Sequence, residues 1–272
     1  MFDINAFFLG ADRLYTENRI AEIEPYLLDG FCAAKTCQDR DAMLSIANEL
    51  IGFYRVKSQY ERCAAYADIA LELIGELSLQ QTEHHGTTLL NIATAYRAAG
   101  RYDEARTMYE DVLSIYQRCL SPEDVRIAGL HNNLSLLYQD MGDIENALQQ
   151  VQLAYDLIQS NDEFPAERAT TLTNLGLMQV KAGHFDEATA SILHAIDRFE
   201  TDVPYRDPHY SAALAAAGQL CFLSQDYDQS IQYYEKALTE IRDVYGENDY
   251  YRTTLNNLAL VRERKKEEGK HG

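Results

Sequence analysis

The chain has 272 residues, a length that suits one large domain or two small ones. Its 43 acidic and 24 basic side chains give a net charge of −19, which disfavours binding to the phosphate backbone of nucleic acids and to anionic membrane surfaces. No apolar run approaches the ~20 residues that cross a bilayer, and residues 1–10 lack the basic and apolar regions of a signal peptide, so we expect a cytoplasmic protein.

Residues 1–41 are irregular but contain apolar side chains at helical spacing, such as Phe7, Phe8 and Leu14. We expect them to form a divergent helical cap. From residue 42 to residue 250 one pattern recurs, and it predicts five tandem repeats at approximately 42–84, 85–126, 127–167, 168–209 and 210–250. Residues 251–272 are predicted to form a C-terminal capping helix followed by a polar tail.

The clearest copies of the pattern are centred on Gly100, Gly142 and Gly183, which are spaced by 42 and 41 residues. An asparagine stands nine residues before each glycine and an alanine stands five residues after it. Weaker copies surround Ser58 and Gln225, where the glycine is lost but the neighbouring residues keep the pattern. A period of this length over most of the chain indicates a repeat protein.

Each repeat predicts two helices joined by a tight turn. Leu89, Ile92, Ala93 and Tyr96 lie at i, i+3, i+4 and i+7, which forms one apolar stripe of a helix. The glycine can take the left-handed conformation that ends a helix. A small residue five positions later lets the two helices cross closely. Because one helix pair cannot bury its own apolar face, we expect an all-α solenoid of about five stacked antiparallel pairs.

This pattern resembles the tetratricopeptide-repeat family, and its long period is similar to the repeats of kinesin light chain. The segment from Tyr245 to Ala259 is similar to that type as well. The resemblance covers roughly residues 42–268. It implies a right-handed superhelix in which the first helix of each pair lines a concave groove, and a protein-binding function without a named partner.

Asparagines are concentrated on the predicted first helices, near the expected groove. An asparagine side chain offers donors and an acceptor that match a peptide unit, so a ladder of them could hold an extended segment. The resemblance implies the same role. The alternative is that these amides bond to the protein's own helix ends and loops. The candidate ligand-binding asparagines are Asn48, Asn91, Asn132, Asn133, Asn174, Asn256 and Asn257.

Two arginines, Arg55 and Arg97, fall on the same helix face and are further candidates for ligand contact. They could grip a carboxylate through paired hydrogen bonds, or form salt bridges within this acidic chain. A carboxylate clamp for chaperone tails is disfavoured, because the first-turn groove positions that would need lysine are occupied by Ser45, Thr87, Gly129 and Thr170.

No motif for catalysis is present: the sequence lacks a phosphate-binding loop, a His-Glu-x-x-His helix and a serine nucleophile elbow. His84 and His85 are adjacent and have no second ligand pair at metal-binding spacing. We therefore expect no enzyme activity, cofactor or metal. The five scattered cysteines are expected to be reduced and buried.

Together these patterns predict a non-enzymatic scaffold that binds an extended peptide or a partner helix in its concave groove. The acidity of the chain favours a partner segment of basic character. Two alternatives remain, which are a bacterial signalling regulator that senses a peptide, and a module that self-associates into a homodimer.

Overall fold

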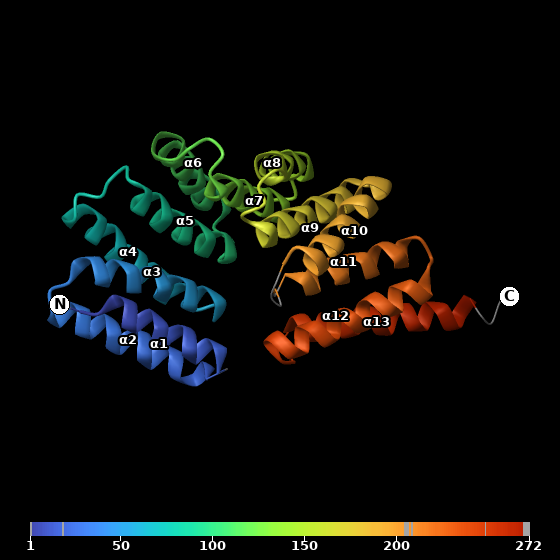
Figure 1. The fold of residues 1–272 in the computed structure, drawn as a ribbon, viewed down its shortest axis with the longest axis horizontal. Helices are drawn as coiled ribbons and strands as arrows, with labels where there is room; N and C mark the ends of the chain where they lie inside the picture. Colours follow the sequence, from blue (N-terminus) through green and yellow to red (C-terminus); the bar gives the residue numbers. More distant parts are fainter. Residues whose placement is uncertain (1, 18, 204–206, 208, 248, 269–272) are drawn as a thin grey trace. The chain divides into compact units, whose positions relative to one another are not determined.

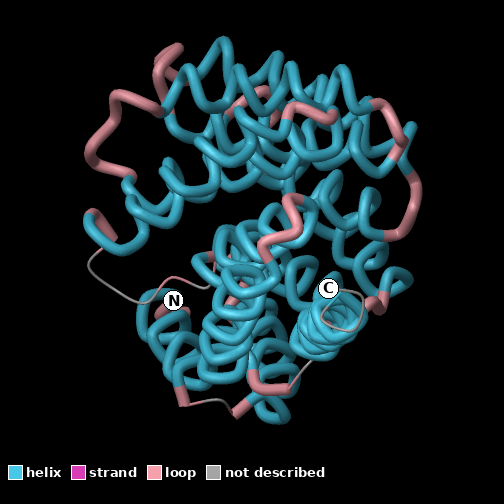
Figure 2. Tube along the Cα trace, turned by 90° about the vertical axis from the view of Figure 1, so that its right-hand side faces the viewer, coloured by secondary structure: helices cyan, strands magenta, loops and turns pink. Residues whose placement is uncertain are grey.

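The computed structural model describes residues 2–17, 19–203, 207, 209–247 and 249–268, and these contain thirteen α-helices and no strand (Figures 1 and 2). This confirms the predicted all-α class of stacked helix pairs. The chain divides into two compact units, residues 1–122 and residues 123–272. Parts of the 203–210 connection (204–206 and 208) and of the predicted polar tail (269–272) lie outside the described residues.

Unit 1 holds six helices, and consecutive helices pack against each other. Its core includes the fully buried Ile23, Leu27, Leu50, Tyr54 and Ile92. These residues come from α2, α3 and α5, so one continuous core joins the N-terminal helices to the repeats that follow. The helices of unit 1 are α1 (Ile4–Thr16), α2 (Ile20–Thr36), α3 (Arg40–Val56), α4 (Tyr60–Glu76), α5 (Glu83–Ala98) and α6 (Tyr102–Cys119).

Unit 2 holds seven helices. The helices α7, α9 and α11 are the first helices of three successive pairs. Each contacts its own second helix, and α9 also contacts both α7 and α11. We call the side formed by these three helices the first-helix face of unit 2 (Figure 1). The helices of unit 2 are α7 (Val125–Asp140), α8 (Ile144–Ile158), α9 (Pro165–Ala182), α10 (Phe185–Thr201), α11 (Tyr210–Leu223), α12 (Tyr227–Tyr245) and α13 (Asp249–Glu268).

The turns between paired helices follow the predicted pattern. Gly100, Gly142 and Gly183 have φ values of 76°, 81° and 82°, in the left-handed region that glycine adopts without steric cost. The two weaker copies make the same turn without glycine, since Ser58 has φ 56° and Gln225 has φ 63°. The conformation of the turn is therefore kept where the glycine is lost.

The small residue five positions after each turn is fully or almost fully buried in every repeat, as a close helix crossing requires. Ser230 also donates a hydrogen bond from Oγ to the carbonyl oxygen of Gly218, at 2.7 Å, across the α11–α12 crossing. The expectation about the cysteines is partly wrong. All five are free thiols, but only Cys63 is buried, while Cys32, Cys37 and Cys119 are exposed.

Candidate functional site

Asparagines on neighbouring first helices bond to each other in unit 1. Nδ2 of Asn48 on α3 donates to Oγ1 of Thr88 on α5, at 3.1 Å, and to the carbonyl oxygen of Leu44. Nδ2 of Asn91, one turn further along α5, donates back to Oδ1 of Asn48 at 3.0 Å. Thr88 is completely buried, so this arrangement satisfies a hydroxyl that has no access to water.

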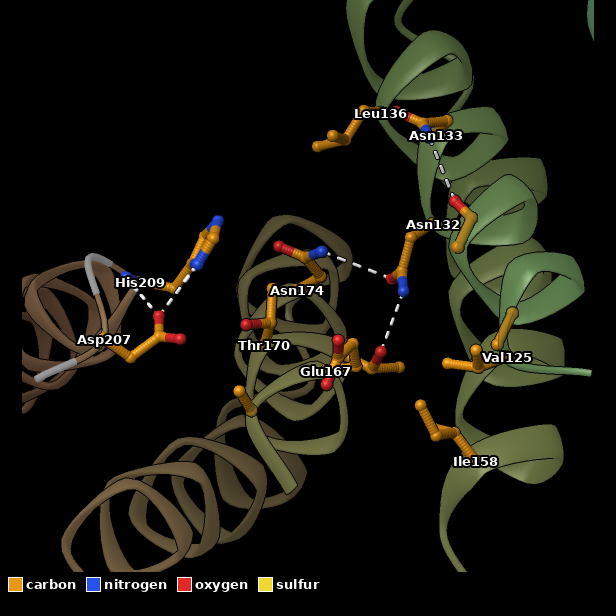
Figure 3. A pocket seen from close by; sticks show the side chains of 14 residues that line it. Val125, Asn132, Asn133, Leu136, Ile158, Glu167, Thr170, Asn174, Asp207 and His209 are labelled. Atoms are coloured by element: carbon orange, nitrogen blue, oxygen red, sulfur yellow. Dashed lines mark hydrogen bonds and ion pairs between the residues drawn. The ribbon is translucent and has the colours of Figure 1, made fainter. Parts of the chain in front are cut away.

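The same arrangement occurs in unit 2 between α7 and α9 (Figure 3). Nδ2 of Asn132 donates to Oγ1 of the buried Thr171 at 2.8 Å, and Nδ2 of Asn174 donates to Oδ1 of Asn132 at 3.2 Å. We call each set of two asparagines and one threonine an asparagine clasp. Every clasp amide therefore donates at least one hydrogen bond within the chain, and Asn48 donates two.

The unit 2 clasp forms one wall of a cavity of about 400 Å³ on the first-helix face. The predicted residues Asn132, Asn133 and Asn174 all line it, together with side chains from α7, α9, the end of α8 and the connection that precedes α11 (Figure 3). Nδ2 of Asn133 is folded back onto its own helix, where it donates to the carbonyl oxygen of Gly129 at 3.1 Å. The other lining residues are Val125, Ala128, Leu136, Ile158, Ala166, Glu167, Thr170, Asp207 and His209.

Gly129 lines the floor of this cavity, and the space where its side chain would be is empty. A glycine in a helix interior costs about 0.5–1 kcal/mol relative to alanine, so it usually has a packing reason. Gly176 and Gly86 have one, because a Cβ there would lie 2.6 Å from Ile192 and 2.5 Å from Tyr116. A Cβ on Gly129 would meet nothing within 4 Å. Packing does not explain Gly129, and its absent side chain leaves room for a ligand to approach the helix.

A second cavity, of about 370 Å³, lies in unit 1 between α3 and the α1–α2 region, and it also contains a glycine without packing contacts, Gly52. Arg55 lines this cavity and forms no ion pair with any described residue. Oη of Tyr15, also in the lining, donates to Oε1 of Glu49 at 3.3 Å. Burial, followed by the charge of Glu49, raises the pKa of Tyr15 to about 12.

The remaining predicted site residues lie elsewhere. Arg97 lies near the buried Tyr109. Burial raises the pKa of Tyr109, while the hydrogen bond with Thr94 and the charge of Arg97 act in the opposite direction. Asn256 and Asn257 are exposed on α13 and line none of the cavities described above.

The sequence patterns did not single out the threonines of the clasps or the carboxylate of Glu167. A signal for the threonines exists, because Thr88 and Thr171 each stand twelve residues before the turn glycine of their repeat. Glu167 carries no comparable signal, since an acidic residue in a first helical turn is ordinary. Asp207 was also missed, because it lies in an irregular connection.

The described part of the chain contains no group of three or more histidine, cysteine or acidic side chains placed to hold a metal ion. Within that same part, no helix combines the length and the apolar character that crossing a membrane requires.

Comparisons with known proteins agree with the fold. A family model described as tetratricopeptide repeat matches residues 42–118, 126–201 and 210–269. Protein KINESIN LIGHT CHAIN-RELATED 3 of Arabidopsis thaliana is 22% identical over 192 residues, which make up 67% of this chain and 29% of that protein. The chain thus spans less than a third of the length of this relative.

Two solved structures illustrate the structural likeness. BtubC (BKLC) from P. vanneervenii has a TM-score of 0.63 and 23% identity, and the match covers 74% of this chain and 82% of that one. The apo form of the quorum sensor NprR from B. thuringiensis has a TM-score of 0.67 and 15% identity, with 96% of this chain and 70% of that one covered. The repeat period, the paired helices and the family match over most of the chain lead to one conclusion: the chain belongs to the tetratricopeptide-repeat family, with repeats of the kinesin-light-chain type.

Proposed function

We propose that this protein is a non-enzymatic interaction module that binds an extended peptide segment of a partner protein at the α7–α9 cavity of unit 2. The observation that carries the proposal is the open floor at Gly129, with Asn132, Asn133 and Asn174 beside it. A helix that keeps an unfavourable glycine without a packing contact, in a cavity lined by polar side chains, has the features of a binding site.

The volume of the cavity limits what it can hold. Pockets for small ligands range from about 300 to 1,000 Å³, so a cavity of about 400 Å³ suits one or two side chains and a short length of backbone. The rest of a partner segment would extend along the exposed parts of the first-helix face. We expect contacts with side-chain amides to set the position of the segment, and the cavity to select one of its side chains.

The test fills the cavity without disturbing the fold. A Cβ at position 129 would meet nothing within 4 Å and would border the cavity, and leucine raises helix propensity, so we expect Gly129→Leu to fold at least as well as the wild-type protein. Peptides are selected from a displayed random library with the wild-type chain, and their dissociation constants are measured by calorimetry on each variant. We expect Gly129→Leu to weaken the selected peptides about tenfold or more, a loss of about 1.4 kcal/mol.

Two variants serve as controls. Gly52→Leu fills the cavity of unit 1 in the same manner, and Gln149→Ala truncates an exposed amide on α8 away from the cavity. Both should bind the selected peptides as the wild type does. Selected peptides that bind Gly129→Leu with unchanged affinity would show that the α7–α9 cavity is not the binding site, and failure to select any peptide would count against the function itself.

A second candidate function is a regulator that senses a peptide and changes shape when it binds. Its support is the likeness to the quorum sensor NprR, which extends over 96% of this chain. Small-angle scattering with and without a selected peptide separates the two functions. A sensor should become more compact at saturating peptide, whereas a scaffold should keep the same radius of gyration.

A further inference from the structure

The asparagines of the α7–α9 cavity use part of their donor capacity within the chain and keep two amide oxygens without a described donor. Asn132, Asn133 and Asn174 each donate one N–H within the chain, to Thr171, to Gly129 and to Asn132 respectively. Oδ1 of Asn133 and Oδ1 of Asn174 accept no hydrogen bond from any described residue. In Figure 3 the amide oxygen of Asn174 lies on the side away from Asn132. A ligand with many hydrogen-bond donors fits such a site.

The charges in the cavity also favour a ligand that is positively charged and carries hydrogen-bond donors. Glu167 is exposed and forms neither a hydrogen bond nor an ion pair with any described residue. Asp207 accepts hydrogen bonds from the backbone N–H of His209 at 2.8 Å and from its ring Nδ1 at 2.9 Å. No lysine or arginine is among the described residues that line this cavity. Among the described residues, the lining thus offers a carboxylate that has no ion partner and contains no cation that would oppose a positive ligand.

The apolar part of the lining suits the stem of a long cationic side chain. Val125, Ala128, Ile158 and Ala166 contribute carbon surface, and the missing side chain of Gly129 leaves space beside it. Lysine and arginine bury their methylene groups against such surface while the charged end reaches polar groups.

The cavity of unit 1 provides a contrast within the same chain. It also has a glycine floor, at Gly52, but Arg55 and Lys57 line it, and its carboxylate, Glu49, accepts a hydrogen bond from Tyr15. A cationic side chain would meet like charges there. Charge therefore distinguishes two cavities that are similar in volume.

From these observations, and resting on the proposed peptide-binding function, we infer that the α7–α9 cavity recognises an arginine side chain of the partner segment. Arginine is preferred to lysine because its planar guanidinium carries five donors that can reach several acceptors at once, here the carboxylate of Glu167 and the amide oxygens. Lysine would place one compact charge against the same carboxylate and use fewer of these acceptors.

The test uses three acetylated and amidated pentapeptides, Ala-Ala-X-Ala-Ala, in which X is arginine, citrulline or glutamate. Citrulline has the shape of arginine without its charge. Each peptide is titrated into the isotopically labelled full chain, and NMR follows the backbone amide of Gly129 and the side-chain amides of Asn132, Asn133 and Asn174. We expect the arginine peptide to shift these signals and to bind about fivefold tighter than the citrulline peptide, while the glutamate peptide causes no shift.

The variant Glu167→Gln isolates the charge of the carboxylate and keeps its size. It should bring the affinity for the arginine peptide close to that for the citrulline peptide, and leave the citrulline affinity unchanged. Glu145→Gln, which neutralises an exposed carboxylate on α8, is the matched control and should preserve the preference for arginine.

The outcomes separate this inference from the proposed function. Equal binding of the arginine and citrulline peptides at the cavity overturns the recognition of arginine but supports peptide binding there. Absence of any shift with the arginine peptide also overturns the inference, and the library selection with Gly129→Leu then decides independently whether the cavity binds other peptides. A preference for arginine that persists in Glu167→Gln shows that Glu167 is not the recognising group.

Discussion

Asn174 donates a hydrogen bond from Nδ2 to Oδ1 of Asn132, 3.2 Å away on the preceding first helix. Asn91 makes the corresponding bond to Asn48 in the other unit. In both cases the accepting asparagine also donates to a buried threonine on the neighbouring helix. These amides hold adjacent first helices in register, and in unit 2 they also present an oxygen atom at the candidate binding site.

The asparagine clasp should contribute measurably to stability. Asn132→Ala removes the donor to the buried Thr171 and the acceptor for Asn174, so we expect it to lower the free energy of unfolding by about 1–3 kcal/mol. Urea unfolding followed by circular dichroism measures this. Asn257→Ala, at an exposed position of α13, is the control and should change stability by less than about 0.5 kcal/mol.

A double-mutant cycle tests the cause of that loss. Thr171→Val replaces the hydroxyl with a methyl group and so removes the need for a hydrogen-bond donor. If the buried hydroxyl is responsible, Asn132→Ala should cost less in the Thr171→Val background than in the wild type. Equal costs in the two backgrounds would contradict the assignment of Thr171 as the partner.

Substitution of two helix glycines by alanine should have opposite effects. Gly129→Ala adds a methyl group in empty space and should stabilise the protein by about 0.8–1 kcal/mol through helix propensity. Gly176→Ala places a Cβ 2.6 Å from carbon atoms of Ile192 and should destabilise it by about 1–3 kcal/mol. Thermal unfolding of the two variants in parallel checks the signs, and a destabilised Gly129→Ala would show that the floor of the cavity is not empty.

The close crossing within a repeat should not tolerate a large side chain. Ala147 is fully buried where α7 and α8 cross, so Ala147→Leu should destabilise the chain by about 1–3 kcal/mol or more. Ala190→Leu makes the same change at an exposed position of α10 and should be close to neutral. Denaturant midpoints of the two variants measure the difference, and similar midpoints would argue against steric crowding at the crossing.

Tyr210, like Tyr15, should titrate at unusually high pH. Burial, followed by a hydrogen bond to Glu200, raises the pKa of Tyr210 from 10.0 to about 12. The folded state thus favours the neutral phenol. The stability that this gives is fully present below pH 10 and is lost as the pH rises from 10 to about 12. Ultraviolet titration of tyrosinate should show one group fewer ionising near pH 12 in Tyr210→Phe, and an unchanged curve there would contradict the shift.

The sequence was sufficient to predict the helix pairs, because they depend on spacing alone. The interval between Gly100, Gly142 and Gly183 located the turns, and the apolar stripes located the helices. The turns at Ser58 and Gln225 could be placed only by extending the period, since neither residue by itself indicates a left-handed conformation. The exposure of Cys32, Cys37 and Cys119 was mispredicted because a frequently buried residue type says little about one position.

The candidate site was only partly predictable. Asn132 and Asn133 are adjacent and therefore differ by about 100° around the helix. One bonds to the next first helix and the other to its own backbone. The period identifies the helix face but does not determine which acceptor each amide reaches, because that depends on the distance between helices. The open space at Gly129 likewise arises from side chains on three helices, so no local pattern reveals it.

The asparagine clasp has a consequence for any shortening or lengthening of this chain. The clasp residues recur after 83 or 84 residues, twice the spacing of the turns. Leu130 on α7 occupies the position in its repeat that Thr88 occupies on α5. If a single repeat were deleted so that α7 packed beside α3, Asn48 would face Leu130 in place of the threonine that accepts its hydrogen bond. These bonds are all kept only when four helices, or two repeats, are removed or duplicated together. A recombined or engineered variant should tolerate changes of that length best.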